Sequence, residues 1–177
     1  MVTVAGELED QEADVVAAAG NVTDRRKGFD EITAEMELLS NSYVQIGFQQ
    51  GEVTRSEVKG SRRKAAGLSM ADIAAQNEFG TRVIPARPFM STSFDENRPR
   101  IVNAVDKEYD KIVSGKSDVR KSLNILGLYM VDLIQQKILA IHSPPNSLET
   151  IRRKGSSKPL IDFGQMFASV RHIVVIQ

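Results

Sequence analysis

One uninterrupted helical pattern constrains this chain more than any other feature of its sequence. From residue 117 to about residue 141, apolar side chains recur at intervals of three and four residues, over about seven helical turns. Two consecutive prolines, Pro144 and Pro145, follow the pattern and predict the end of the helix. A helix this long and this one-sided predicts a core built along its length. Its apolar stripe comprises Val119, Leu123, Leu126, Met130, Leu133, Ile134, Ile138 and Ile141.

Short strands are predicted on both sides of the helical region. Residues 43–48 alternate in polarity, with Val44, Ile46 and Phe48 on one face, and residues 170–176 form a second apolar run. Strands that flank a helical middle predict an α+β fold. We expect a small antiparallel or mixed sheet packed against two long helices, together with an extended N-terminal arm and a long loop.

The second long helix is predicted over residues 91–113, where Pro99 should kink or divide it. Its expected buried stripe comprises Ile101, Val105, Tyr109 and Ile112. Shorter helices are expected over residues 29–39, 69–77, 148–154 and 163–169, and residues 82–84 are a candidate short strand. Ser69 and Asp72 resemble a capping box at the start of one of these helices.

The chain has 177 residues and no net charge, but its charges are unevenly distributed. Residues 1–50 hold ten acidic and three basic side chains, whereas residues 51–177 carry a net charge of +7. Residues 1–28 are acidic and poor in large apolar side chains, so we expect an arm that precedes a single α+β domain at residues 29–177. A neutral protein has no long-range field to gather nucleic acid, and oppositely charged regions suit contacts between subunits.

The residue types argue against several classes of chemistry. There is no cysteine, and the two histidines, His142 and His172, are 30 residues apart, which disfavours disulfides, thiolate zinc sites and histidine metal clusters. The sequence contains no phosphate-binding glycine loop, zinc-protease motif or nucleophile elbow. No apolar run approaches the length of a membrane span, and the first residues lack the pattern of a signal peptide. We therefore expect no enzymatic activity, cofactor, metal site or membrane association.

A basic cluster lies in the polar segment that follows the first predicted strand. Its members are Arg55, Lys59, Arg62, Arg63 and Lys64, opposed only by Glu57. Three roles are open for this cluster: a solvated loop, docking onto an acidic neighbouring protein, and salt-dependent contact with the phosphates of duplex DNA. Because no aromatic residue is interleaved for base stacking, recognition of single strands is a poor fit. We expect the cluster mainly to contact a neighbouring protein.

Residues 77–89 are the most informative part of the sequence. They contain Asn-Glu-Phe-Gly-Thr at residues 77–81 and Ile-Pro-Ala-Arg-Pro-Phe at residues 84–89. The glycine permits a turn that is closed to other residues, and the two prolines make the chain rigid and extended. We therefore predict a rigid turn that presents its aromatic and arginine side chains at fixed positions: Phe79, Arg87 and Phe89. The alternative is that the two phenylalanines are core residues.

This stretch resembles the hallmark of tailed-bacteriophage neck and tail-completion proteins, the virion morphogenesis and putative tail-component families. Their pattern is Glu-Phe-Gly-Thr, a few residues, then Ile/Met-Pro-Ala/Pro-Arg-Pro-Phe and a helix. A second block is similar to the C-terminal block of these families and comprises residues 143–146, 150–155, 158–162 and 164–166, followed by a strand. Phe163 stands where the families usually have threonine, so any hydrogen bond from that side chain is absent. The resemblance covers about residues 43–177 and excludes the acidic arm.

The resemblance implies a non-enzymatic structural protein of a virion, assembled in the host cytoplasm. It implies a homo-oligomeric ring, typically a hexamer, in the neck of a tailed phage, which completes the tail and joins it to the head. The implied partners are other copies of the chain, head connector or adaptor proteins, and tail terminator, tail tube or sheath proteins. Non-specific contact with genomic DNA in the channel is a further implication.

Within this interpretation, the rigid turn is the expected projecting feature of each subunit. Phe79, Arg87 and Phe89 are the candidate anchors of the subunit interface, because interface hot spots favour arginine and aromatic residues. Asp162 is a candidate partner of Arg87. The alternative function, based on residues 55–64, is a DNA-binding or packaging accessory protein.

Overall fold

The computed structural model describes residues 28–49, 69–162 and 164–177, and it has an α+β fold. Residues 28–41 are helical. They are followed by β1 (Tyr43–Phe48), α2 (Met70–Phe79), α3 (Met90–Val113), α4 (Val119–Ala140), α5 (Leu148–Lys154), α6 (Gln165–Ala168) and β2 (Val170–Val175). The predicted fold class is confirmed, and so are the helices and strands expected at these positions. The acidic arm up to residue 27 and the basic cluster at residues 55–64 lie outside the described residues.

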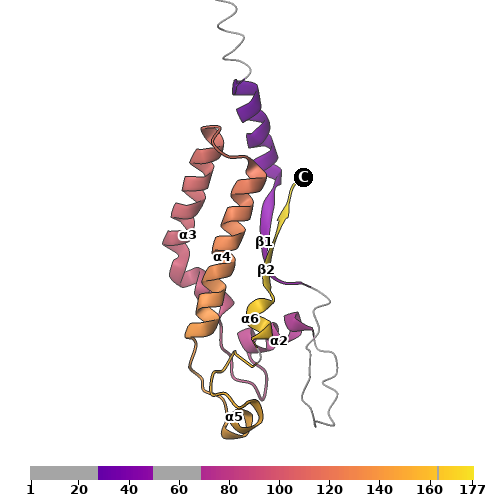
Figure 1. The fold of residues 1–177 in the computed structure, drawn as a ribbon, viewed down its shortest axis with the longest axis vertical. Coiled ribbons are helices and arrows are strands. Elements are labelled where there is room, and N and C mark those ends of the chain that lie inside the picture. Colours follow the sequence, from indigo (N-terminus) through magenta and orange to yellow (C-terminus); the bar gives the residue numbers. More distant parts are fainter. Residues whose placement is uncertain (1–27, 50–68, 163) are drawn as a thin grey trace, which may run out of the picture.

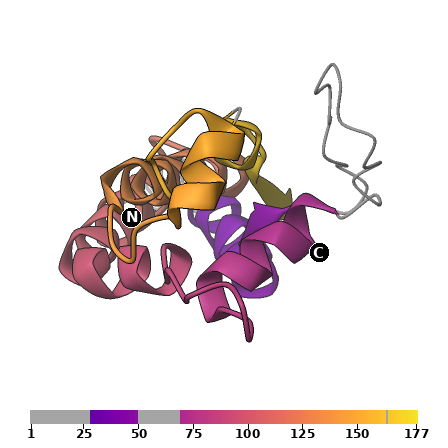
Figure 2. The ribbon, with the colours of Figure 1, turned by 90° about the horizontal axis from the view of Figure 1, so that it is seen from below.

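Helix α4 lies between α3 on one side and the two strands on the other (Figure 1). Figure 1 shows α3, α4 and the strands side by side along the long axis, with the helical segment 28–41 at the upper end. The short helices α2, α5 and α6 gather at the lower end (Figure 1). Seen from below, α3 and the strands lie on different sides of α4 (Figure 2). The elongated body therefore has two distinct ends and two distinct flanks.

The sheet consists of β1 and β2, paired antiparallel from Tyr43 opposite Val175 to Phe48 opposite Val170. Ile46 and Phe48 pack against the main core, as the alternating pattern predicts. The intervening residues belong to the opposite face, where Tyr43 and Ile173 are exposed. One face of the sheet is thus covered by α4, and the other is open in the described part of the chain.

The stripe predicted on α4 is the centre of the core. Six of its eight residues are buried, namely Val119, Leu123, Leu126, Leu133, Ile134 and Ile138. The lower part of this stripe joins the main cluster, which contains Phe89, Leu160 and Met166. The upper part joins a second cluster, in which Leu38 and Leu39 of the helical segment 28–41 pack near Ile112. None of the described helices is both long enough and apolar enough to cross a membrane.

The buried stripe predicted on α3 is wrong at two positions. Val105 is 41% exposed and Tyr109 is 44% exposed, whereas Ile112 is buried. The face of α3 that is buried includes the polar residues Ser93 and Glu108. Because Ser93 and Glu108 are buried while Val105 and Tyr109 are exposed, part of the apolar stripe of this helix lies on a face that the described residues leave open.

Of the two effects predicted at Pro99, a kink or a division of the helix, the division does not occur, because α3 is a single helix through this residue. Proline removes one backbone hydrogen bond from a helix, and the packing of α3 along α4 offsets that loss. An ion pair between Glu96 and Lys137, with a 2.7 Å contact, also joins the two helices just before Pro99.

Helix α4 and strand β2 approach each other closely at Gly127. A Cβ atom at this position would lie 2.6 Å from Cγ of His172, so a larger residue requires the strand to move. The same imidazole contacts Asn124 Oδ1 at 2.6 Å through its Nε2 atom. Since the amide oxygen only accepts, Nε2 of His172 carries the proton that is donated.

We expect Gly127→Ala to destabilise the protein by about 1–3 kcal/mol through overpacking, although alanine favours helices. Thermal or urea unfolding followed by circular dichroism measures this effect. The control is the double variant Gly127→Ala/His172→Ala, in which the clash is absent, so its stability should exceed the value expected from adding the two single effects. Strict additivity of the two substitutions would contradict the close approach.

Candidate functional site: a braced loop at one end of the molecule

A buried guanidinium ties two distant segments of the chain together. Arg87 is 4% exposed, and its backbone N–H donates to the carbonyl oxygen of Asn77 at 2.6 Å. Its side-chain Nε donates to the carbonyl oxygen of Pro144 at 2.7 Å, and Nη2 donates to that of Pro145 at 3.2 Å. The segment between α2 and α3 is therefore fastened to the segment that follows α4.

The charge of Arg87 is satisfied by backbone carbonyls and not by a carboxylate. Burial lowers the pKa of Arg87, but a guanidinium starts from so high a value that it keeps its proton. The two ion pairs of the described residues are Glu108–Lys111 and Glu96–Lys137, so the pairing predicted between Asp162 and Arg87 is wrong. Five donors in a fixed plane suit several carbonyl oxygens better than one carboxylate does.

Glu78, in the last turn of α2, caps the first turn of α3. Its carboxylate accepts from the backbone N–H groups of Met90 and Ser91, both at 2.9 Å, and from the Ser91 hydroxyl at 2.6 Å. The first residues of a helix have free N–H groups, and a negative charge there also complements the helix dipole. The residue at the capping position, Phe89, provides no side-chain hydrogen bond, so Glu78 supplies the cap from another helix.

The turn between these two braces is closed by Gly80 and Thr81. Gly80 has a φ of 75°, and a Cβ on it would lie 2.8 Å from the backbone nitrogen of Ala86. The Thr81 N–H donates to the carbonyl oxygen of Ile84 at 2.8 Å, and its hydroxyl accepts from the Val83 and Ile84 N–H groups at 3.2 and 3.0 Å. Residues 82–84 form bends and not the predicted strand, because Thr81 takes up the amide groups that a strand partner would need.

Of the three predicted anchors, the structure exposes only one. The prediction that Arg87 and Phe89 project is wrong, because both are buried within the monomer. Phe89 is fully buried and contacts Phe48 edge-to-face, with ring centroids 6.1 Å apart. Phe79, by contrast, is 82% exposed. Arg87 and Phe89 therefore anchor the turn in the interior of the monomer, whereas Phe79 is exposed on its surface.

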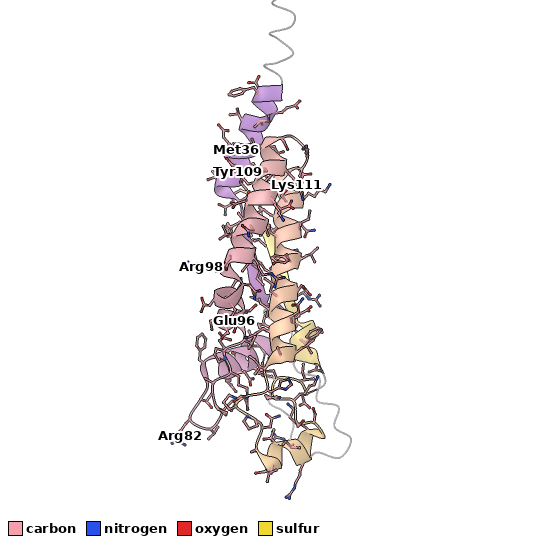
Figure 3. All side chains as sticks on the ribbon, turned by 90° about the vertical axis from the view of Figure 1, so that its left-hand side faces the viewer. Met36, Arg82, Glu96, Arg98, Tyr109 and Lys111 are labelled. Carbon is pink, nitrogen blue, oxygen red and sulfur yellow. The ribbon has the colours of Figure 1, made fainter. Side chains whose placement is uncertain are left out.

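We define the braced loop as residues 79–84, the outer part of this turn. Val83 is 83% exposed and accompanies Phe79 as a second apolar side chain on its surface. Figure 3 shows Arg82 of this loop standing away from the body at its lower end. An apolar surface that is held rigidly and is not covered by the described residues is an arrangement suited to binding a partner.

The two sequence blocks that carry the family resemblance meet at the base of the braced loop. Arg87 belongs to the first block, and its acceptors Pro144 and Pro145 belong to the second. Asn146 extends the connection, because its side-chain amide donates to the carbonyl oxygen of Lys158 at 3.1 Å. Neither this junction nor the cap by Glu78 was predicted from the sequence. The residues that form them are 12 and 57 positions apart, and no local sequence pattern indicates contacts at such separations.

Within residues 28–49, 69–162 and 164–177, no three histidine, aspartate or glutamate side chains gather closely enough to hold a metal ion. Comparison of the chain with protein families, with characterised proteins and with solved structures gives no match in any of the three.

We expect Arg87→Ala to lower the free energy of unfolding by about 1–3 kcal/mol, because the buried carbonyl groups lose their charged donor. Arg87→Lys should recover only part of the loss, since an ammonium cannot reproduce the planar pair of contacts. Urea unfolding measures both variants, and Arg82→Ala on the exposed tip is the matched control with little expected effect. Wild-type stability of Arg87→Ala would refute the bracing role.

Proposed function

We propose that this chain is a structural protein of a tailed-phage virion, which forms a ring in the neck, completes the tail and joins it to the head connector. One observation carries the proposal: Arg87 links the two blocks of the family resemblance and holds a loop that exposes Phe79. The residues of the resemblance thereby serve one physical purpose, which is to present a rigid contact surface.

The construction of the braced loop favours binding over catalysis. Two charged side chains, Glu78 and Arg87, are buried in order to satisfy backbone groups on either side of the loop. Such bracing lowers the entropy lost when the loop meets a partner, so more of the contact energy appears as affinity. Aromatic residues in this position are frequent hot spots of protein interfaces.

The position of the loop suits contact along the axis of a ring. The body is elongated, and the braced loop lies toward its lower end (Figures 1 and 3). In a ring whose subunits stand parallel to the axis, the loops of all copies face the next component of the neck. We therefore propose a head connector or a tail protein as the partner of Phe79 and Val83, and Phe79 also stays a candidate for the subunit interface.

We expect Phe79→Ser to leave the fold unchanged and to block head–tail joining, because the side chain is exposed in the monomer and buried in the proposed contact. The measurement is complementation of a virus in which the gene is silenced, with joined and separate heads and tails counted by electron microscopy. Phe29→Ser is the matched control, since Phe29 is also an exposed aromatic residue but lies on the helical segment 28–41.

Normal joining by Phe79→Ser would contradict the role of the braced loop. Loss of ring formation, with monomers that fold normally, would instead assign Phe79 to the contact between subunits. Normal joining in the complete absence of the chain would overturn the proposed function itself.

A further inference from the structure

The lower end of the molecule carries a group of cationic side chains that the described residues do not neutralise. Arg152, Arg153 and Lys154 lie in the last turn of α5, and Lys158 follows shortly after. All except the half-buried Lys154 are exposed, and neither of the two ion pairs among the described residues involves any of the four. The helix dipole offsets only about half an elementary charge at a C-terminus. We call these four side chains the α5 patch.

Lys154 lies in an environment that holds two other cations and one anion. Burial lowers the pKa of Lys154, Asp162 raises it, and the charges of Arg87 and Arg153 lower it again. Its ammonium group donates to the carbonyl oxygen of Pro159 at 3.3 Å. Since residues 148–162 hold four basic and only two acidic side chains, the α5 patch keeps positive charge for an anionic partner.

The opposite end of the molecule is acidic. The helical segment 28–41 contains four acidic side chains and no basic one. One of them, Glu35, is half-buried and accepts from the backbone N–H of Val119 at 2.9 Å. The other three are exposed, and two of them lie about two helical turns apart, which places them on the same side of the helix. We call these three side chains the upper acidic face, which comprises Asp30, Glu31 and Glu37.

The rest of the sequence adds to both charges. Residues 1–27, which lead into the upper segment, hold six acidic and three basic side chains, whereas residues 50–68, which lead into α2, hold five basic and two acidic ones. Helix α4, with 22 residues, is about 33 Å long, and the two charged ends lie toward its opposite ends (Figure 1). Charges are screened over about 8 Å at physiological ionic strength, so one copy cannot neutralise its own two ends.

We propose that copies of this chain associate end to end, with the α5 patch of one copy on the upper acidic face of the next. A second copy satisfies both charged ends, whereas duplex DNA or an anionic membrane is attracted by the lower end and repelled by the upper one. The inference goes beyond the proposed function and does not depend on it, because it concerns the free protein. In the proposed neck, a head or tail protein takes the place of the second copy at the lower end.

The contact joins two different surfaces and is therefore heterologous. After two copies have met, one acidic end and one basic end stay free, so further copies add along the long axis. A single exposed ion pair contributes little, but several charges of one sign that face several of the other sign fix the orientation of a contact.

The first test is the ionic strength at which the wild-type protein assembles. We expect self-association to weaken by about tenfold or more as the Debye length falls from about 30 Å at 0.01 M salt to about 3 Å at 1 M. Sedimentation velocity separates this association from ring formation. A ring closes at one size, whereas end-to-end assemblies grow with protein concentration.

Charge reversal in the α5 patch tests the lower surface. Arg152→Glu/Arg153→Glu/Lys158→Glu makes the lower end acidic like the upper one, so self-association at low salt should weaken by about tenfold or more. The matched control reverses three exposed cations of α3, has the same net charge and should assemble like the wild type. Its substitutions are Arg98→Glu, Arg100→Glu and Lys107→Glu.

Charge reversal in the upper acidic face tests the other surface. Asp30→Lys/Glu31→Lys/Glu37→Lys should weaken self-association to the same extent. A mixture of this variant with the α5 variant should assemble again, because the acidic lower end of one then meets the basic upper end of the other. Such rescue distinguishes a contact between the two surfaces from damage to either of them.

Four results would overturn the inference: a wild-type protein that does not grow with concentration at low salt, assembly that stops at the dimer, growth that both reversals leave unchanged, or a mixture that does not assemble. Failure of the proposed function is a separate result. If the virus joins heads to tails without this chain but the mixture rescues assembly, the inference stands and the function is wrong. If Phe79→Ser blocks joining while the purified wild-type protein does not grow, the function stands and the inference is wrong.

Discussion

The structure at the lower end of this molecule depends on the buried guanidinium of Arg87, which bonds to backbone carbonyl groups and not to a carboxylate. Transferring a charge from water into the protein is unfavourable unless hydrogen bonds replace those lost to solvent. Arg87 meets this condition through carbonyl oxygens that belong to the turn after α4. The position of the segment between α2 and α3 therefore depends on the position of a turn more than fifty residues away. Each segment is therefore held in place in part by the other.

Glu78 is a second buried charged side chain, and like Arg87 it forms its hydrogen bonds mainly with backbone groups. The two side chains have opposite charges and lie nine positions apart in the sequence, yet each one bonds to backbone groups. A direct pair would neutralise the charges but would leave the amides of α3 and the carbonyls after α4 unsatisfied. By bonding to the backbone, the two residues fix three segments of chain. The exposed surface of the braced loop owes its rigidity to this arrangement.

Most of the fold could be predicted from the sequence, because most elements carry a local signal. The apolar residues of α4 follow one helical period, and most of them are buried in the core. The capping box of Ser69 and Asp72 also forms as expected, with contacts of 3.1 and 3.2 Å. The pattern on α3 was misleading for a physical reason. Its apolar residues Val105 and Tyr109 lie on a face that the monomer leaves open, while Glu108 is buried against the rest of the molecule. Periodicity reveals that a helix has an apolar face but not which neighbour covers it.

At the candidate site, too, the sequence pattern could predict the local turn but not which side chains are buried. The rigid turn and the glycine requirement at Gly80 follow from residue types alone, and both are present. The roles of Phe79, Arg87 and Phe89 could not be separated in this way, since all three are common in interfaces and in buried clusters. Their separation depends on where Pro144 and Phe48 lie in space. Long-range geometry of this kind is encoded by the whole chain and not by a motif.

The sheet can form only after residues 170–175 have been synthesised, because β1 has no other partner among the described residues. Helices α3 and α4 are neighbours in sequence and can pair early, since local contacts form faster than distant ones. During synthesis the side of α4 that receives β2 therefore lacks this strand until residues 170–175 have been made. The interval between the completion of α4 and the arrival of β2 is the stage at which a nascent chain of this design is most prone to aggregate.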